Sequence, residues 1–113
     1  MTNELIKKIE DLGWSVYISD GFIDLRKYSP EGEDFGFTIK DKEEDLDILE
    51  QICDYWNDFD PEEHAGFWWE NREVAGTPQS IRVLLQDADD IEEMLKDLYY
   101  ELEKFLDERK GVN

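Results

Sequence analysis

Carboxylates dominate two blocks of the sequence and are its most prominent chemical groups. Residues 41–63 contain eleven acids and one base, and residues 87–108 contain ten acids and two bases. Residues 1–40 hold eight acids and five bases, so the excess is not spread over the whole chain. Helical spacing would place the carboxylates of each block on one exposed face. The expected partner-binding carboxylates are Glu43, Asp47, Glu50, Asp54 and Asp58 in the first block, and Asp89, Glu93, Asp97 and Glu101 in the second.

Such rows could bind a positively charged surface. Steps of four residues separate neighbours in a helix by about 6 Å along its axis. Duplex DNA carries one charge per about 1.7 Å of axis over both strands, so two adjacent rows would offer a comparable field. Like-charged neighbours destabilise a helix by about 0.2–0.5 kcal/mol per pair, and lysines at alternate positions would remove that cost. The pattern favours a phosphate-like binding surface, and the alternative is that the acids serve only solubility.

Catalytic and metal-binding patterns are poorly matched. An EF-hand loop starting at Asp58 needs glycine at its sixth position and glutamate at its twelfth, where this chain has Glu63 and Trp69. His64 is the only histidine and Cys53 the only cysteine, so the chain has neither a zinc-ligand set nor an internal disulfide. Glycine-rich phosphate loops and nucleophile elbows are also missing from the sequence. We expect a protein that is not an enzyme and that has no cofactor or metal.

The run GFWWE suggests a second kind of contact. Phe67, Trp68 and Trp69 are consecutive, so one helix face cannot bury all three rings. We expect at least one ring to be partly exposed, with Trp68 and Trp69 as a candidate aromatic anchor for a protein partner. The alternative is that the rings are wedged between the last helix and the sheet. Tyr100 points away from the apolar seam of its helix toward the acidic face, and is a further candidate contact.

Composition indicates one folded domain over residues 1–113. Hydrophobic residues make up 40% of the chain, which is too many for a disordered protein even at a net charge of −19. That charge repels nucleic acid and anionic membranes, so cationic or basic protein partners are expected. No apolar run approaches the roughly 18 residues of a membrane span, and the N-terminus does not resemble a signal peptide. With a single cysteine, the chain is expected in the cytoplasm.

Periodicity predicts the elements that carry these residues. Residues 3–12 are expected to form an amphipathic helix ended by Gly13, followed by strands over residues 14–19, 22–28 and 35–40. Trp14, Val16 and Ile18 would share one face of the first strand. The Asp20-Gly21 turn and the short connections favour an antiparallel meander.

Helical spacing returns after Lys40. Helices are predicted over residues 43–59, 61–72, 78–86 and 88–109, with Pro61 at a first helical position and with Thr77 and Asp87 as caps. In the first of these helices the apolar and acidic residues separate cleanly around the axis, and Asp45 alone breaks the partition. The predicted fold is α+β: an N-terminal helix, a three-stranded antiparallel meander, then three to four helices with a long C-terminal helix.

The segment FDPEEHAGFWWE…GTPQSIRVLLQDADDIEEMLKDL, residues 59–98, resembles small proteins from prophages and mobile elements of Gram-positive bacteria. In size, charge and helix-borne carboxylates, the chain is also similar to phage DNA-mimic inhibitors of the antirestriction and anti-CRISPR type. This similarity implies a bacterial cytoplasm and a target nuclease or CRISPR effector whose basic DNA-binding channel is blocked. It transfers no individual residues.

The functional expectation is a non-enzymatic acidic protein that inhibits a DNA-handling enzyme by presenting carboxylate rows to its basic channel. Its partner would be the basic surface of a nucleic-acid-binding protein, without direct binding to nucleic acid or membrane. The alternative is a protein–protein interaction or dimerisation module whose acidity serves only solubility. The sequence is compatible with a monomer or a dimer.

Overall fold

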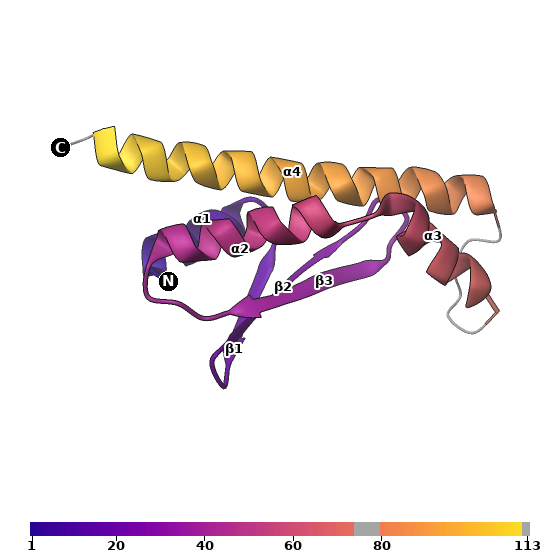
Figure 1. Ribbon diagram of the computed structural model, residues 1–113, viewed down its shortest axis with the longest axis horizontal. Coiled ribbons are helices and arrows are strands. Elements are labelled where there is room, and N and C mark those ends of the chain that lie inside the picture. Colours follow the sequence, from indigo (N-terminus) through magenta and orange to yellow (C-terminus); the bar gives the residue numbers. More distant parts are fainter. Residues whose placement is uncertain (74–79, 112–113) are drawn as a thin grey trace.

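The computed structural model describes residues 1–73 and 80–111, with side chains through Arg109. The described residues form a helix, three strands and three further helices in chain order (Figure 1), which confirms the predicted α+β fold with its long C-terminal helix. The elements are α1 (Asn3–Asp11), β1 (Ser15–Ser19), β2 (Phe22–Tyr28), β3 (Asp34–Lys40), α2 (Asp45–Asp58), α3 (Pro61–Glu70) and α4 (Ile81–Gly111).

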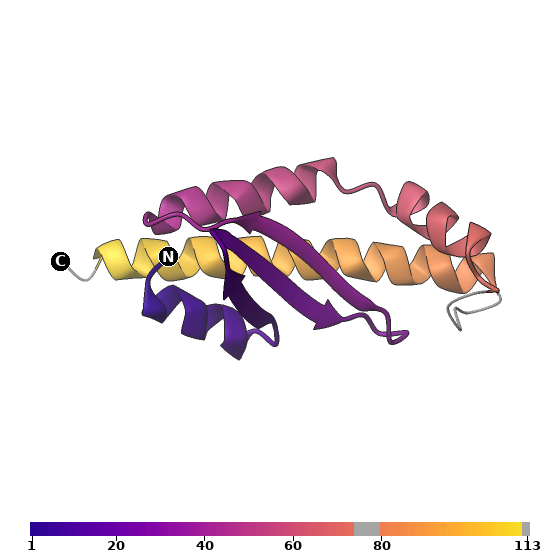
Figure 2. The same ribbon diagram turned by 90° about the horizontal axis from the view of Figure 1, so that it is seen from below.

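The strands form the predicted antiparallel meander, in the order β1-β2-β3. Side chains alternate between the two faces, so Ile23 and Leu25 of β2 and Phe35, Phe37 and Ile39 of β3 all point into the core. Figure 2 shows the helices on one side of the sheet, with α4 in the middle and α1 and α2 on either side of it. The other face of the sheet carries no helix in the described part of the chain.

The first strand differs in part from the prediction. It begins at Ser15, and Trp14 is buried just before it, with its ring edge-on to Phe35 and Phe37. Alternation predicts that Ile18 shares a face with Trp14 and Val16, and along this face Trp14 is buried, Val16 half-buried and Ile18 exposed. Ile18 lies on the edge strand next to the β1–β2 turn, which projects from the body of the molecule in Figure 1. The alternating pattern therefore predicts the strand, but it does not predict which of its residues the helices cover.

Helix α4 is continuous, so the predicted division into residues 78–86 and 88–109 is wrong. Asp87 does not cap a helix but lies inside α4, where its buried carboxylate accepts hydrogen bonds from Ser29 Oγ (2.7 Å) and from the backbone N–H of Glu31 (3.1 Å). An aspartate bonded to another segment no longer competes for the backbone of its own helix. The predicted break at residues 76–78, with Thr77 as N-cap, lies outside the described residues.

Two hydrophobic clusters hold the helices. In the larger one, the sheet and α1, α2 and α4 pack together. Helical spacing predicts an apolar seam on α4, and all of its residues are buried except Phe105, which is half-buried: Ala88, Ile91, Leu95, Leu98, Leu102 and Phe105. The smaller one joins Ala65 of α3 to Leu84 and Ala88 of α4. Pro61 begins α3 as predicted, because the Asp60 side chain caps that end. Among the described residues, no helix is long and apolar enough to cross a membrane.

Candidate interaction surface

The first carboxylate row lies on the outer surface of α2. Asp47, Glu50, Asp54 and Asp58 are all exposed, as is Glu43 just before the helix begins. These five residues are called the α2 row. Apolar residues on the opposite side of α2, including Ile48, Leu49 and Ile52, are buried against the sheet and α4. The amphipathic pattern thus orients the helix as predicted, with its acids in solvent.

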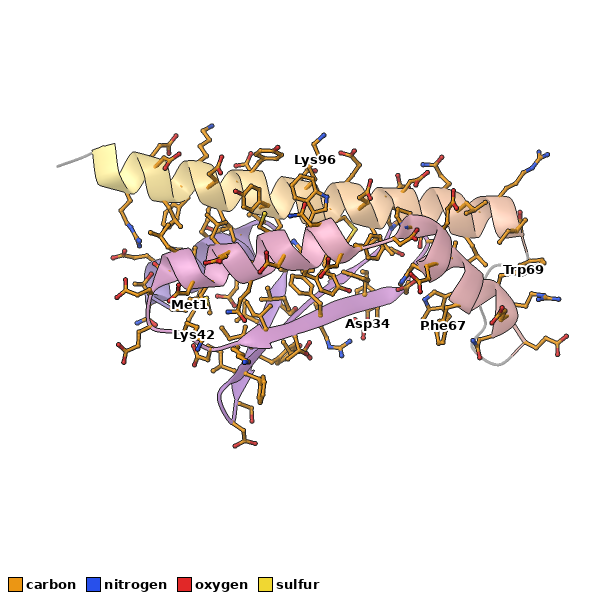
Figure 3. All side chains as sticks on the ribbon, viewed as in Figure 1. Met1, Asp34, Lys42, Phe67, Trp69 and Lys96 are labelled. Carbon is orange, nitrogen blue, oxygen red and sulfur yellow. The ribbon has the colours of Figure 1, made fainter. Side chains whose placement is uncertain are left out.

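The second row lies on α4 and consists of Asp89, Glu93, Asp97 and Glu101, called the α4 row. All four side chains are exposed. Figure 3 shows Lys96 projecting from the outer side of α4. Its Nζ lies 3.9 Å from Glu93, and Lys8 Nζ of α1 lies 3.9 Å from Glu101. Exposed pairs at this distance contribute about 0–1 kcal/mol, so they neutralise the row only weakly.

Other carboxylates of the two rows have no ion-pair partner among the described residues. This is the case for seven of the nine row residues: Glu43, Asp47, Glu50, Asp54, Asp58, Asp89 and Asp97. Two arginines pair outside the rows: Arg26 with Asp24 at 2.9 Å and Arg109 with Asp45 at 2.9 Å. The carboxylates are therefore available to a partner.

The two rows do not form one strip. Trp56 of α2 lies between the helices, with its ring centroid 5.8 Å from Tyr99 and 5.7 Å from Tyr100 of α4. These three side chains are called the aromatic ridge. Asp54 and Asp58 line a hollow beside β3, whereas Asp97 and Glu101 line a hollow beside α1. Since α4 runs between α1 and α2 (Figure 2), the rows face different sides of the helical layer.

The aromatic candidates lie in two separate places. Tyr100 is 49% exposed within the aromatic ridge and so adjoins the carboxylate rows. Trp68 and Trp69 are only partly buried against the smaller cluster, and the Arg72 guanidinium lies 4.0 Å from the Trp69 ring centre. Phe67, labelled with Trp69 in Figure 3, is 58% exposed and is the most exposed ring of the GFWWE run. At least one ring is partly exposed, as the sequence predicts.

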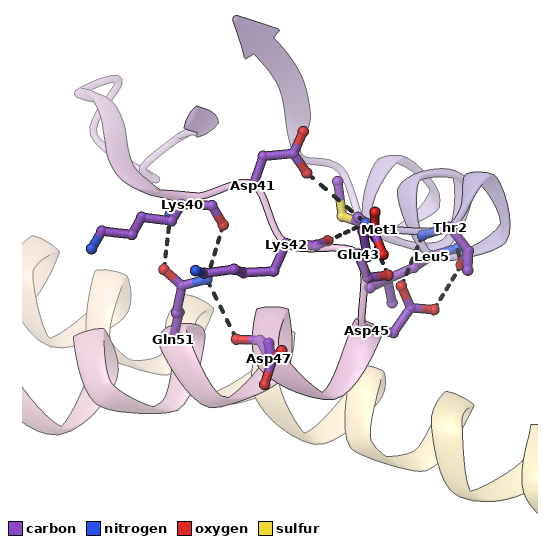
Figure 4. A network of polar contacts seen from close by, with 10 residues as sticks. All are labelled: Met1, Thr2, Leu5, Lys40, Asp41, Lys42, Glu43, Asp45, Asp47 and Gln51. Carbon is purple, nitrogen blue, oxygen red and sulfur yellow. Dashed lines mark hydrogen bonds and ion pairs between the residues drawn. The ribbon is translucent and has the colours of Figure 1, made fainter. Parts of the chain in front are cut away.

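Asp45 is the acid that broke the partition of the α2 wheel, and the structure explains why. It is buried, and it accepts hydrogen bonds from the backbone and side chain of Thr2 (2.8 and 2.7 Å, Figure 4) and from Arg109 (2.9 Å). Burial alone would raise the pKa of Asp45, but these hydrogen bonds outweigh it, so that pKa lies below its ordinary value. Asp45 is a structural residue rather than part of a binding row.

The remaining chemical candidates also have structural partners. His64 Nε2 lies 3.0 Å from both carboxylate oxygens of Glu33, which ties α3 to the β2–β3 loop. Cys53 is half-buried rather than fully buried, and Asn57 Nδ2 lies 3.6 Å from its Sγ. Among the described residues, no group of three potential ligands is placed to hold a metal ion.

Comparison with family models, with curated proteins and with solved structures gives no match.

Proposed function

We propose that this protein is a non-enzymatic inhibitor that binds the basic, DNA-reading surface of a DNA-handling enzyme in place of DNA. A CRISPR effector or a restriction nuclease in a bacterial cytoplasm fits this description. One observation carries the proposal: the α2 and α4 rows are exposed on packed helices, and seven of their nine carboxylates have no ion-pair partner within the described part of the chain. Arginine and lysine side chains that normally contact phosphates would pair with them.

The separation of the rows constrains the shape of the target. A flat surface would contact one row, whereas a cleft that encloses the helical layer would contact both. DNA-binding channels are clefts of this kind, because a duplex carries phosphates around its circumference. The proposed target therefore has a concave basic channel whose walls reach both sides of α4.

Ion pairs alone would not make a tight complex. A nanomolar complex requires about 12 kcal/mol, and each exposed pair supplies about 0–1 kcal/mol. Tyr100 lies in the aromatic ridge between the rows, and Tyr and Trp side chains supply much of the binding energy at protein interfaces. Central contacts to the aromatic ridge would add to the charge pairs, and opposed fields would speed association.

The test is a charge reversal that leaves the core untouched. A variant with Asp47→Lys, Asp54→Lys, Glu93→Lys and Glu101→Lys alters only exposed positions of the two rows. Inhibition of DNA binding would be measured across a panel of purified CRISPR effectors and restriction nucleases, at several salt concentrations. We expect at least one target whose inhibition by the native protein weakens steeply with salt and is lost in the variant.

The matched control changes the same number of exposed acids outside the rows: Glu10→Lys, Asp11→Lys, Glu31→Lys and Glu70→Lys. Both variants lose the same amount of negative charge, so a general charge effect would weaken them equally. Equal loss of inhibition in the two variants, or inhibition that ignores salt, would contradict the proposal. Failure to inhibit any member of the panel would also count against it.

An interaction module is the second candidate, and the open sheet face favours it. Tyr17, Phe22 and Tyr28 are all more than half exposed on this face. Exposed aromatic side chains on an uncovered sheet face favour a protein contact. In that case the acids would serve solubility, and self-association measured by sedimentation would persist at high salt. Replacement of the three rings by serine would abolish it, whereas the row reversal would leave it unchanged.

A further inference from the structure

The outer edge of β3 already binds an amide. The Gln51 side chain of α2 accepts a hydrogen bond from the backbone N–H of Lys40 (2.8 Å) and donates one to the carbonyl of Lys40 (2.9 Å), as Figure 4 shows. This is the pair of bonds that a residue of a neighbouring strand would make. The side-chain amide of Gln51 therefore takes the place that a peptide group of a neighbouring strand would take beside Lys40, at the end of β3.

The following positions along that edge are open. Backbone groups of alternate residues point to the same side of a strand, so the N–H and C=O of Thr38 and Gly36 point outward as those of Lys40 do. Among residues 1–73 and 80–111, no hydrogen bond to these outward groups is found. The edge strand has seven residues, has no proline and carries Gly36 without a side chain. Such an edge is a template for another extended chain.

A groove runs beside this edge, beneath α2. It has a volume of about 540 Å³ and is bordered by β3 on one side and α2 on the other; Thr38, Lys40, Gln51, Asp54, Tyr55 and Asp58 are among its lining residues. A second hollow of about 250 Å³ shares Tyr55 and Asp58 and continues to His64. The Tyr55 ring is stacked on the Phe37 ring, with 4.4 Å between the ring centroids, and it forms an apolar wall of the groove.

Two of the three charged side chains that line the groove are acids, and the third is Lys40, so the groove favours a basic occupant. Asp54 and Asp58 both line it and are one helical turn apart, about 6 Å along the axis. Alternate side chains of an extended strand are about 6.8 Å apart and project to the same side. Basic side chains at two alternate positions could therefore reach the two carboxylates together. Asp60 and Glu63 in the adjoining hollow extend the negative field.

We propose that the groove between β3 and α2 binds an extended peptide segment with arginine or lysine at alternate positions. Its backbone would pair with Thr38 and Gly36 as a fourth strand, and its basic side chains would pair with Asp54 and Asp58. The proposal does not depend on DNA mimicry, because it requires a linear peptide and an open strand edge rather than a basic channel.

A display library of random twelve-residue peptides, selected on the folded full-length chain, is the probe. Selected peptides are expected to carry basic residues at alternate positions and to shift the amide resonances of Gly36 and Thr38. Thr38→Pro removes the outward N–H, and an edge strand tolerates proline where its N–H faces outward. We expect at least a tenfold loss of affinity, while Thr38→Ser, which keeps the N–H, stays within twofold of the native protein.

Two further comparisons protect the test from a folding defect in the proline variant. Backbone N-methylation of the selected peptide should abolish binding when it blocks the alternate amides that face β3. Methylation of the other alternate amides, which face away from β3, should leave binding intact. Asp54→Asn with Asp58→Asn should weaken binding about tenfold, and Asp89→Asn with Asp97→Asn on α4 should not. Peptides without alternate basic residues, equal binding to the proline and serine variants, or a library that yields no binder would each overturn the proposal.

Discussion

The Asp45 carboxylate lies 2.9 Å from the Arg109 guanidinium and so joins the first turn of α2 to the C-terminal part of α4. Thr2 donates two further hydrogen bonds to the same carboxylate, which brings the start of α1 into the contact. Three helices that are far apart in the sequence therefore meet at one buried acid. In a chain with so few cations, this ion pair fixes structure rather than surface charge.

Replacement of Asp45 by asparagine should destabilise the protein at neutral pH by about 2 kcal/mol, because charge-assisted hydrogen bonds are replaced by neutral ones. The loss should depend on pH. The pKa of Asp45 is lower in the folded state than its unfolded value of about 3.9, so its contribution is present above that value and lost as pH falls through the folded pKa.

Urea unfolding of the native protein and of the Asp45→Asn variant, from pH 7 down to pH 3, measures this difference. We expect the two stabilities to converge in the acid range. Asp47→Asn, on the exposed side of the same helix, is the control and should show no such convergence. A difference that stays constant down to pH 3 would contradict the assignment.

Asp87→Ala should destabilise the protein by about 2 kcal/mol, because Ser29 Oγ and the Glu31 N–H would lose their buried acceptor. The neighbouring Asp89→Ala removes an exposed acid of the α4 row and should be nearly neutral or slightly stabilising. Guanidinium unfolding of the two variants provides the comparison. Equal stabilities would show that Asp87 does not hold the β2–β3 loop.

The Tyr99 hydroxyl should ionise at a higher pH in the folded protein than in the unfolded chain. Its hydroxyl donates a hydrogen bond to Glu103 Oε2 at 2.8 Å, and this bond, with burial, raises the pKa of Tyr99 to about 12. Since the unfolded pKa is about 10, the stabilising contribution is complete below pH 10 and is lost as pH rises toward 12. Absorbance titration of the native protein and of the Glu103→Gln variant tests this. In the variant, one tyrosine should ionise at a lower pH than it does in the native protein.

Asp97→Lys should stabilise the protein. Asp97 repels Glu93 and Glu101, which lie four residues away on either side in the α4 row. A lysine at position 97 would attract both of them. At about 0.2–0.5 kcal/mol per pair, the expected gain is about 1 kcal/mol at low salt. Thermal unfolding at low and high salt should show a gain that shrinks as salt rises. A loss of stability at low salt would mean that the row is not under repulsion.

Local patterns predicted much of the architecture. The change from alternation to helical spacing after Lys40 placed the sheet and helices in the correct order, and the apolar seam from Ala88 to Phe105 identified most of the buried face of α4. The exceptional position of Asp45 on its helical wheel was also visible. A buried acid within an otherwise apolar half is a signal for a tertiary partner, although neither Thr2 nor Arg109 could be named from spacing.

Tertiary hydrogen bonds account for what local patterns missed. Asp87 has the residue type and position of a helix cap, yet its partners lie in the β2–β3 loop, far from it in the sequence. Gln51 looks like an ordinary polar residue of α2, and only the folded structure brings its amide to the edge of β3. Likewise, the separation of the two rows follows from the packing of α1 and α2 on opposite sides of α4.

The continuity of α4 has a consequence for local opening. Its first turns extend beyond the sheet and carry α3, where Ala65, Leu84 and Ala88 form a small buried cluster that Trp68 and Trp69 partly cover. Detachment of α3 would leave the larger cluster intact and therefore requires less free energy than global unfolding. Amide hydrogens of α3 should exchange with solvent well before those of the central strand, so the end that bears Phe67 can rearrange while the rest stays folded.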